Sequence, residues 1–468
     1  MCSSRGLFLR SSWASAAARR IVAPPVSRSC PLWVSKRGYS HTNPPPPQHT
    51  ATGTATDAFK GLVKDVGREK AVLRLPRTEM NELDERTVDV HYIQLRDGCQ
   101  CPRCVDPQTK QRFFRTSEIP EDIAPREMKW VDDSESNRQK VLEISWNKNL
   151  AGHDIDKTHV TRLTADDINY PPAYFHQRTV AAAGKPRLHW DKNDMELAQH
   201  WISYQDYMEN DGLLMNALHN LSLYGLLFVH DIPDSRDMVE NLATRMGPLR
   251  NTFYGATWDV RHDPQAKNVA YTNKNLGFHM DLLYVQNPPG FQLLHCLRNS
   301  CEGGESLFVD AFGAAADLDA KSWQTLATFE VPYHYDHSHQ YYRMTRPVLE
   351  SFAGNNLSYV NYSPPFQGPF HINSGEAISW TDRMKEFISA VIQFENRIHD
   401  PSRIFELKLK PGQCVIFENR RVLHARRAFD TTAGERWLAG AYVDEDAVHS
   451  RIFTLKRNSG LFRGVTSS

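Results

Sequence analysis

The sequence predicts a mainly β protein with flanking helices, made of a large C-terminal domain and a small β-rich N-terminal domain. Short apolar runs at 226–229 and 414–417 are typical of strands buried in a core. Apolar residues at helical spacing in 377–398 indicate a long amphipathic helix that packs on the sheets. Three cysteines that follow the strand-like run 88–95 mark the smaller domain. A chain of 468 residues has room for both domains.

The charge and hydropathy of the chain argue against two classes of partner. The 55 basic and 55 acidic residues cancel, so no net charge favours nucleic acid or an anionic membrane surface. No uninterrupted apolar run approaches the roughly 18 residues that a membrane-spanning helix needs. The sequence therefore predicts a soluble protein that binds neither nucleic acid nor membrane.

The N-terminus has the composition of a mitochondrial transit peptide. Residues 1–56 contain seven Arg and Lys residues, many Ser and Ala, and no acidic residue before Asp57. A secretory signal would instead need one compact apolar stretch. We expect a transit peptide at 1–40 that directs the protein to the mitochondrial matrix, followed by a linker at 41–74 with four consecutive prolines. A disordered basic tail is the alternative.

A cysteine cluster indicates a structural metal site. Cys99, Cys101 and Cys104 lie within six residues, which is too close for three separate disulfides. In a reducing compartment such thiols are better explained by zinc, which favours four closed ligands such as three cysteines and one histidine. His153 and His159 are the candidates for the fourth ligand, and three free buried thiols are the alternative. We expect a zinc-binding domain at 75–168.

The large domain is expected to extend over 169–468 and to begin with an irregular connection at 171–184. Apolar spacing predicts helices at 194–209 and 235–246, the second of which ends at Gly247. These helices build the outer face of the domain and have no predicted role in chemistry.

A histidine and a carboxylate in one strand indicate a second metal site. His279 and Asp281 are two residues apart, so on an extended strand their side chains point to the same face. With a second histidine they would form the facial triad that holds non-haem Fe(II) and leaves positions open for a co-substrate and O2. The spacing alone is weak evidence, because the same pattern occurs at 189–191 and 334–336.

The region downstream supplies the missing ligand and a cation. A Pro-Gly turn and the buried strand at 414–417 lead to a second strand that ends in His424. Arg436 follows twelve residues later. A guanidinium at this distance suits the remote carboxylate of 2-oxoglutarate, which favours a bidentate partner in a dry pocket.

These motifs resemble those of the γ-butyrobetaine dioxygenase and trimethyllysine dioxygenase family, within the taurine-dioxygenase-like Fe(II)/2-oxoglutarate oxygenases, over about residues 85 to 455. The resemblance implies a double-stranded β-helix, a jelly-roll relative. It implies that Fe(II) is held by His279, Asp281 and His424, and that 2-oxoglutarate is held by Arg436 and Ser306. It also implies O2 as co-substrate, ascorbate to keep the iron reduced, and His159 as the fourth zinc ligand.

Aromatic residues near the iron strand bear on the substrate. From spacing alone, aromatic residues beside a sheet are usually part of the core. In γ-butyrobetaine dioxygenases, however, the positions that match Tyr254, Trp258, Tyr271 and Tyr442 form a cage around a trimethylammonium group. Ring faces suit this group because a quaternary ammonium has no N–H to donate. The resemblance therefore implies a small-molecule quaternary-ammonium substrate.

One further position separates the two branches of the family. Asn268 matches an asparagine that meets the substrate carboxylate in γ-butyrobetaine dioxygenases and an aspartate in trimethyllysine dioxygenases, and an aspartate would repel a bare carboxylate. The resemblance thus implies hydroxylation of γ-butyrobetaine to L-carnitine, in carnitine biosynthesis.

Two alternatives stay open on the sequence. Asn361-Tyr362-Ser363 stands where the family places two consecutive asparagines, which leaves trimethyllysine or another small substrate as a second choice. A non-enzymatic metal-binding protein would lack one of the triad residues or Arg436, and all four are present. The residues do not decide between a monomer and a homodimer.

Overall fold

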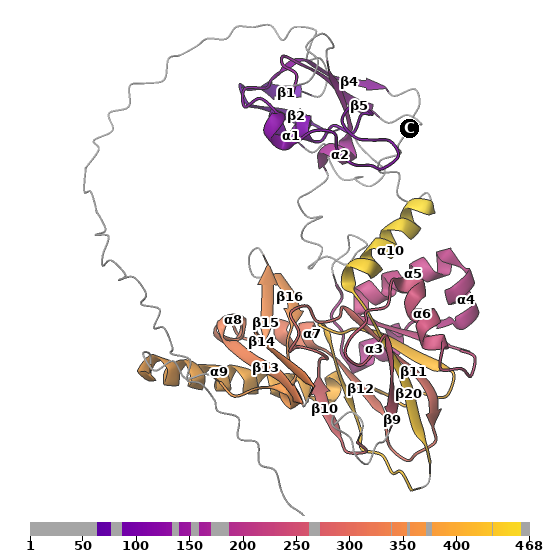
Figure 1. The fold of residues 1–468 in the computed structure, drawn as a ribbon. Coiled ribbons are helices and arrows are strands. Elements are labelled where there is room, and N and C mark those ends of the chain that lie inside the picture. The colour runs from indigo at the N-terminus through magenta and orange to yellow at the C-terminus, as the bar shows by residue number, and fades with distance from the viewer. Residues whose placement is uncertain are drawn as a thin grey trace, which may run out of the picture. The chain divides into compact units, whose positions relative to one another are not determined.

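The chain forms several β-sheets with helices on their outer faces (Figure 1). The structure is a computed structural model. The transit peptide predicted at 1–40, the connection at 171–184, His153, Asn268 and Tyr271 lie outside the residues that it describes. The described residues are 63–75, 87–132, 140–150, 159–169, 187–261, 272–337, 339–352, 356–370, 377–432 and 434–459.

The N-terminal part contains two small antiparallel sheets and two short helices. Their shared core includes the buried side chains of Leu73, Met128 and Trp146. The first sheet has the order β1-β2-β3 and the second β4-β5-β6. The elements are β1 (Val63–Val66), β2 (Lys70–Arg74), β3 (Thr87–His91), α1 (Tyr92–Asp97), β4 (Pro125–Asp132), β5 (Lys140–Trp146), β6 (Val160–Thr164) and α2 (Ala165–Asn169).

Two predictions for this part need correction. The run predicted as a strand at 88–95 is a strand only to His91, and helix α1 begins at the next residue, Tyr92. Tyr92, Leu95 and Arg96 are all buried, and their spacing of three and four residues is that of a helix face. The linker predicted at 41–74 contains β1 and β2, because β2 pairs along its whole length with β3. The other domain limits stay predictions.

The large domain is built on two facing sheets, and it has the double-stranded β-helix, or jelly-roll, architecture that the resemblance implies. Phe308 of one sheet packs against Phe417 of the other, with ring centroids 5.8 Å apart. The six-stranded sheet has the order β7 (Trp201–Ser203), β8 (Leu226–His230), β18 (Gln413–Glu418), β11 (Phe291–Asn299), β20 (Arg436–Val443) and β9 (Thr257–Arg261). The four-stranded sheet has the order β10 (Leu276–His279), β19 (Val422–Arg426), β12 (Ser306–Asp310) and β17 (Phe405–Leu407).

Helices cover the outer face of the six-stranded sheet (Figure 1). Leu214 and Leu242 of these helices share a buried cluster with Leu293 and Ile416 of the strands. Burial of such side chains contributes about 1.5–3 kcal/mol each to stability. The helices are α4 (Tyr204–Glu209), α5 (Asp211–Tyr224), α6 (Met238–Met246) and α10 (Glu445–Asn458). Helix α3 (Lys192–Ala198) instead contacts β17 of the four-stranded sheet.

The single helix predicted at 194–209 is wrong. The chain leaves the helix after Ala198, forms strand β7 and re-enters a helix at Tyr204. Strand β7 pairs in parallel with β8, and the indole of Trp201 stacks on Phe228 at 4.8 Å. Tertiary pairing therefore overrides the local helical spacing. Helix α6 begins three residues later than predicted and ends, as predicted, at Gly247.

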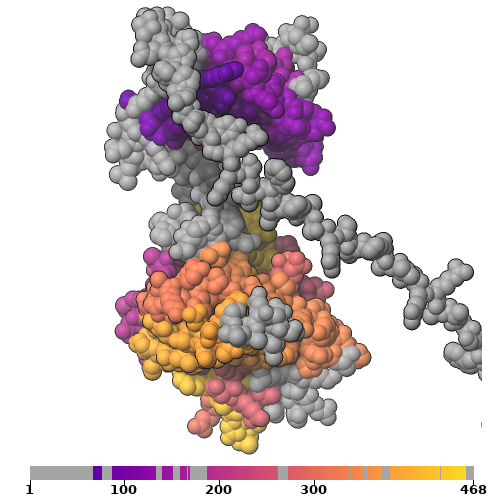
Figure 2. Space-filling model, turned by 90° about the vertical axis from the view of Figure 1, so that its left-hand side faces the viewer, coloured from indigo at the N-terminus to yellow at the C-terminus, as the bar shows by residue number. Residues whose placement is uncertain are grey.

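A long insertion lies between β12 and β17 and forms the face shown in orange in Figure 2. The helix predicted at 377–398 is confirmed as α9 (Ala377–Ile398). It packs on α8, and its Phe387 ring stacks on that of Phe329, the residue directly after α8, at 4.4 Å. The other elements are α7 (Ala311–Ala316), α8 (Ala320–Thr328), β13 (Glu330–His337), β14 (Gln340–Pro347), β15 (Leu349–Phe352) and β16 (Asn356–Val360). No helix among the described residues is both long and apolar enough to cross a membrane.

Candidate active site

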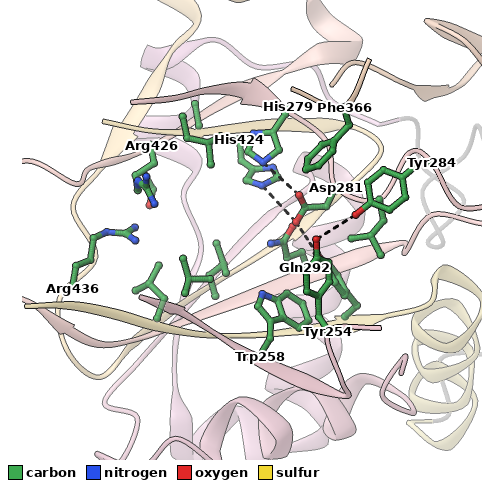
Figure 3. Close-up of a pocket in the computed structure, with 18 residues that line it drawn as sticks. Tyr254, Trp258, His279, Asp281, Tyr284, Gln292, Phe366, His424, Arg426 and Arg436 are labelled. Carbon is green, nitrogen blue, oxygen red and sulfur yellow. Dashed lines mark hydrogen bonds and ion pairs between the residues drawn. The ribbon is translucent and has the colours of Figure 1, made fainter. Parts of the chain in front are cut away.

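The fold brings His279, Asp281 and His424 together inside the barrel (Figure 3). Strands β10 and β19 are antiparallel neighbours, and His279 lies directly opposite His424. The Nε2 atom of His279 is 3.4 Å from Oδ1 of Asp281, and Nε2 of His424 is 3.9 Å from Oδ2. The ligand atoms of the three side chains all lie within 4.8 Å of one another, so one metal ion could contact all of them.

The protonation states of these groups suit a metal. The Nδ1 atom of His279 donates to the carbonyl oxygen of Gly277 at 2.9 Å, which leaves the lone pair of Nε2 free for a metal. Burial and then the neighbouring His279 lower the pKa of His424 to about 3, so its ring is neutral. Burial opposes ionisation of Asp281, but its polar neighbours, first His279, then His424 and the Tyr442 hydroxyl, hold its pKa below the ordinary value. Two imidazoles and one carboxylate form the donor set of a non-haem Fe(II) site.

Asn419 holds the backbone beside Asp281 in place. Its Oδ1 accepts from the backbone N–H of Asp281 at 2.9 Å, and its Nδ2 donates to the carbonyl oxygens of Asp281 and Pro289. The next residue, Leu282, has a φ of 59°, which a leucine rarely adopts without such support. The sequence did not reveal this role, because an asparagine between two strands is common in ordinary turns.

A buried cation lies in the same pocket. Arg436 begins β20 and is 6% exposed, and its Nε has no hydrogen-bond partner among the described residues. Burial lowers its pKa to about 10, so it stays charged at neutral pH. The pocket also contains Ser306, and Gly304 allows the close approach, since a Cβ there would lie 3.1 Å from Cδ of Arg436. An unpaired buried guanidinium beside a hydroxyl fits the remote carboxylate of 2-oxoglutarate.

A second arginine was not predicted. Arg426 ends β19 and lines the pocket beside Arg436. Its Nη2 donates to the carbonyl oxygens of Thr272 and Lys274, at 2.6 and 2.9 Å. Burial and then the charge of Arg436 lower its pKa to about 9. Its place in the sequence, two residues after His424, would have been the available signal.

The aromatic residues lie in the part of the pocket away from the arginines. Figure 3 shows Arg426 and Arg436 at one end and Tyr284 and Phe366 at the other, with the metal-ligand candidates between them. Of the predicted cage residues, Tyr254, Trp258 and Tyr442 line this pocket, while Asn268 and Tyr271 lie outside the described residues. The lining residues that sequence reasoning missed include Tyr284, Gln292 and Phe366.

Two of the cage residues form one wall. The rings of Trp258 and Tyr442 stack with their centroids 4.0 Å apart and 28° between their planes. This distance leaves no room for a cation between them, so a ligand could meet the pair only from its open side. On another side, the hydroxyl of Tyr254 lies 3.4 Å from that of Tyr284.

Asn361 and Ser363 are buried and do not line this pocket. The Nδ2 of Asn361 donates to the carbonyl oxygen of Pro347 and to Glu350, and its Oδ1 accepts from Arg420. Its amide is therefore used within the fold rather than offered to a ligand.

The cysteine cluster forms in the N-terminal part. The Nε2 atom of His159 lies 3.2, 3.8 and 3.6 Å from the sulfurs of Cys99, Cys101 and Cys104. The four ligand atoms lie within 4.8 Å of one another, so the set could hold zinc. Arg96 is buried beside it and donates to Sγ of Cys104 at 3.4 Å.

Two family profiles match the chain. Residues 194–442 match the family described as taurine catabolism dioxygenase TauD, TfdA family. Residues 79–154 match the family described as gamma-butyrobetaine hydroxylase-like, N-terminal.

Three relatives are similar over most of the chain. Dioxygenase str8 from Strobilurus tenacellus is 35% identical over 377 residues, which cover 76% of this chain and 83% of that protein. Gamma-butyrobetaine dioxygenase from Pseudomonas sp. (strain AK-1) is 31% identical over 378 residues, which cover 80% and 92%. Mitochondrial trimethyllysine dioxygenase from Homo sapiens is 28% identical over 369 residues, which cover 76% and 80%.

Proposed function

The chain belongs to the TauD, TfdA family of 2-oxoglutarate-dependent dioxygenases, and from this premise we propose that it hydroxylates γ-butyrobetaine to L-carnitine. One observation carries the choice of substrate. Among the described residues that line the pocket, Asp281 is the only carboxylate, and we assign it to the metal. A trimethylammonium can be held by ring faces alone, at about 0.5 to 2 kcal/mol per contact, whereas a second, primary ammonium would need an acceptor.

Different residues along the pocket would bind the metal, the co-substrate and the substrate. His279, Asp281 and His424 would hold Fe(II), and Arg436 with Ser306 would bind the remote carboxylate of 2-oxoglutarate. When bound, Fe(II) and 2-oxoglutarate supply the activation of O2 that inserts oxygen into a C–H bond, with succinate and CO2 as co-products. The aromatic wall would orient the substrate and exclude water, which fixes the C–H bond that reacts. Ascorbate would keep the iron reduced.

A second candidate is a dioxygenase that acts on trimethyllysine or another small substrate. Two observations favour it: Asn361 and Ser363 lie outside the pocket, and a relative at 35% identity is named only as a dioxygenase. The relatives that are named for γ-butyrobetaine and trimethyllysine are 31% and 28% identical, which is too close to decide by identity.

A product assay separates the candidates. The protein, reconstituted with Fe(II), 2-oxoglutarate and ascorbate, is given γ-butyrobetaine, trimethyllysine and 4-aminobutyrate in parallel, and the products are identified by mass spectrometry. We expect carnitine as the dominant product and no turnover of 4-aminobutyrate, whose compact ammonium would have to shed tightly held water. Dominant hydroxytrimethyllysine would reject our choice, and no product from either trimethylated substrate would favour an unknown one.

We also propose a mitochondrial location and a structural zinc. The location rests on the basic residues of 1–40 and on similarity to relatives named as mitochondrial. A fluorescent fusion of the full chain should enter mitochondria, and a fusion that lacks 1–40 should not. The zinc rests on the three cysteines gathered around His159.

A further inference from the structure

The hydroxyl of Tyr442 contacts a candidate iron ligand. It donates to Oδ2 of Asp281 at 2.7 Å, and Tyr442 is only 2% exposed. The other oxygen, Oδ1, lies 3.4 Å from Nε2 of His279. Oδ2 thus accepts the tyrosine hydrogen bond and lies 3.9 Å from Nε2 of His424, while Oδ1 has no contact with the tyrosine and lies nearest His279.

This division matters for the metal. A carboxylate that bound Fe(II) through both oxygens would take a second coordination position. A facial triad needs three positions left open for the co-substrate and O2. A hydrogen bond that holds Oδ2 keeps Asp281 a ligand through one oxygen.

The ring that carries this hydroxyl is held firmly. Trp258 stacks on Tyr442 at 4.0 Å, and the indole lies against Gly440 of the same strand, where a Cβ would come within 2.5 Å of it. The backbone carbonyl of Tyr442 accepts from the N–H of Arg250 at 2.9 Å. The packing around the ring therefore keeps the hydroxyl in place, and its hydrogen bond limits rotation of the Asp281 carboxylate.

We propose that Tyr442 is a positioning residue for Asp281, so that the substrate wall and the iron site form one hydrogen-bonded unit. The inference rests on the proposed iron ligands and not on the identity of the substrate. In this arrangement the hydroxyl of Tyr442 orients a ligand of the metal, while its ring contacts the substrate.

The test distinguishes the role of the Tyr442 hydroxyl from that of the Tyr442 ring. Tyr442→Phe keeps the stacked ring and removes only the hydrogen bond. Tyr254→Phe is the matched control, because it removes a hydroxyl of the same pocket that lies 3.4 Å from Tyr284. The dissociation constant for Fe(II) is measured without O2, and the ratio of succinate to hydroxylated product is measured during turnover.

We expect Tyr442→Phe to weaken Fe(II) binding about tenfold, as loss of a hydrogen bond to a metal ligand commonly does. We also expect more succinate per product, with little change in the KM of the quaternary-ammonium substrate. Tyr254→Phe should bind Fe(II) as the unmodified protein does.

Three outcomes would overturn the inference. The first is an unchanged Fe(II) affinity in Tyr442→Phe, and the second is an equal loss of Fe(II) affinity in Tyr442→Phe and Tyr254→Phe. The third is a rise in the KM of the quaternary-ammonium substrate in Tyr442→Phe without a change in Fe(II) binding. His279→Ala distinguishes this failure from a failure of the proposed function. If it retains Fe(II), the ligand set itself is wrong; if it loses Fe(II) while Tyr442→Phe does not, only the positioning role is wrong.

Discussion

Gly440 shapes the pocket because it has no side chain. It pairs with Trp258 across strands β20 and β9, and a Cβ at Gly440 would lie 2.5 to 2.7 Å from three atoms of the indole. Real Cβ atoms do not approach so closely, so the ring must move if the glycine is replaced. A glycine inside a strand commonly marks such a close approach.

We predict that Gly440→Ala displaces Trp258 and damages the substrate wall. The KM for the quaternary-ammonium substrate should rise about five- to tenfold, and stability should fall by about 1–3 kcal/mol from overpacking. Enzyme kinetics and thermal unfolding check both. Gly277→Ala is the control for stability, since a Cβ there meets no atom within 4 Å. A Gly440→Ala protein with unchanged KM would show that Trp258 does not contact the substrate.

His295 is a buried titratable group outside the proposed chemistry. It is 0% exposed, and neither of its ring nitrogens has a hydrogen-bond partner among the described residues. Burial lowers its pKa to about 4, against a small opposing effect of Asp234. The folded protein therefore binds this proton less readily than the unfolded chain, whose histidine titrates near about 6.5.

The sign of the pH effect follows from this difference. The contribution of neutral His295 to the free energy of unfolding is complete above about pH 6.5. It decreases as the pH falls toward about 4, with a slope approaching about 1.4 kcal/mol per pH unit. Between pH 7.5 and 5 the metal-free protein should lose about 2 kcal/mol through His295. Over the same pH range the His295→Leu protein should lose about 2 kcal/mol less stability than the unmodified protein. Urea unfolding at each pH measures the difference. An identical loss in both proteins would contradict the assignment.

The helices and strands that the local sequence predicted correctly are those with a regular burial pattern. Strands β8 and β18 are almost wholly buried, so each appears in the sequence as a continuous apolar run. Helix α9 shows its apolar spacing over 22 residues. Strand β7 is only three residues long and depends on pairing with β8, which no local pattern records.

The cysteine cluster is the element-scale feature with the clearest test. The loop that carries the three cysteines meets His159 just before β6, more than fifty residues away. We predict one zinc per chain besides the iron, and loss of that zinc in Cys101→Ser, because the donor set becomes incomplete. Metal analysis of the purified protein measures both contents.

The control is Cys301→Ser, which changes a buried cysteine of the large domain. It should retain zinc. Equal zinc content in Cys101→Ser and the unmodified protein would show that the cluster does not bind zinc.

At the scale of the whole molecule, the pocket is assembled from both sheets. The four-stranded sheet supplies His279, His424 and Ser306, and the six-stranded sheet supplies Arg436 and Tyr442. His279, Asp281 and His424 could be singled out from the sequence because His-x-Asp, the later histidine and Arg436 in combination resemble the motifs of a known family. Roles that depend on how distant segments pack could not be predicted, such as those of Asn419, Arg426 and Tyr284.

The separation of the two ends of this pocket leads to the last prediction. Figure 3 shows Arg436 at one end and Tyr284 and Phe366 at the other, with the candidate iron ligands between these ends, and it shows Trp258 apart from Arg436. Arg436→Lys replaces a planar fork by a point charge, so the KM for 2-oxoglutarate should rise about tenfold or more while that for the substrate changes little. Trp258→Ala should do the reverse, and their effects should add because the two residues share no ligand.

Steady-state kinetics with each of the two ligands varied in turn checks this independence in the single and double variants. Arg427→Lys is the control, because Arg427 is exposed and pairs with Glu406 at 2.8 Å, and it should change neither KM. If Arg436→Lys raised both KM values equally, Arg436 would not be specific to 2-oxoglutarate. If the double variant departed strongly from additivity, the two ends of the pocket would be energetically coupled, and the division of the site into a co-substrate end and a substrate end would be wrong.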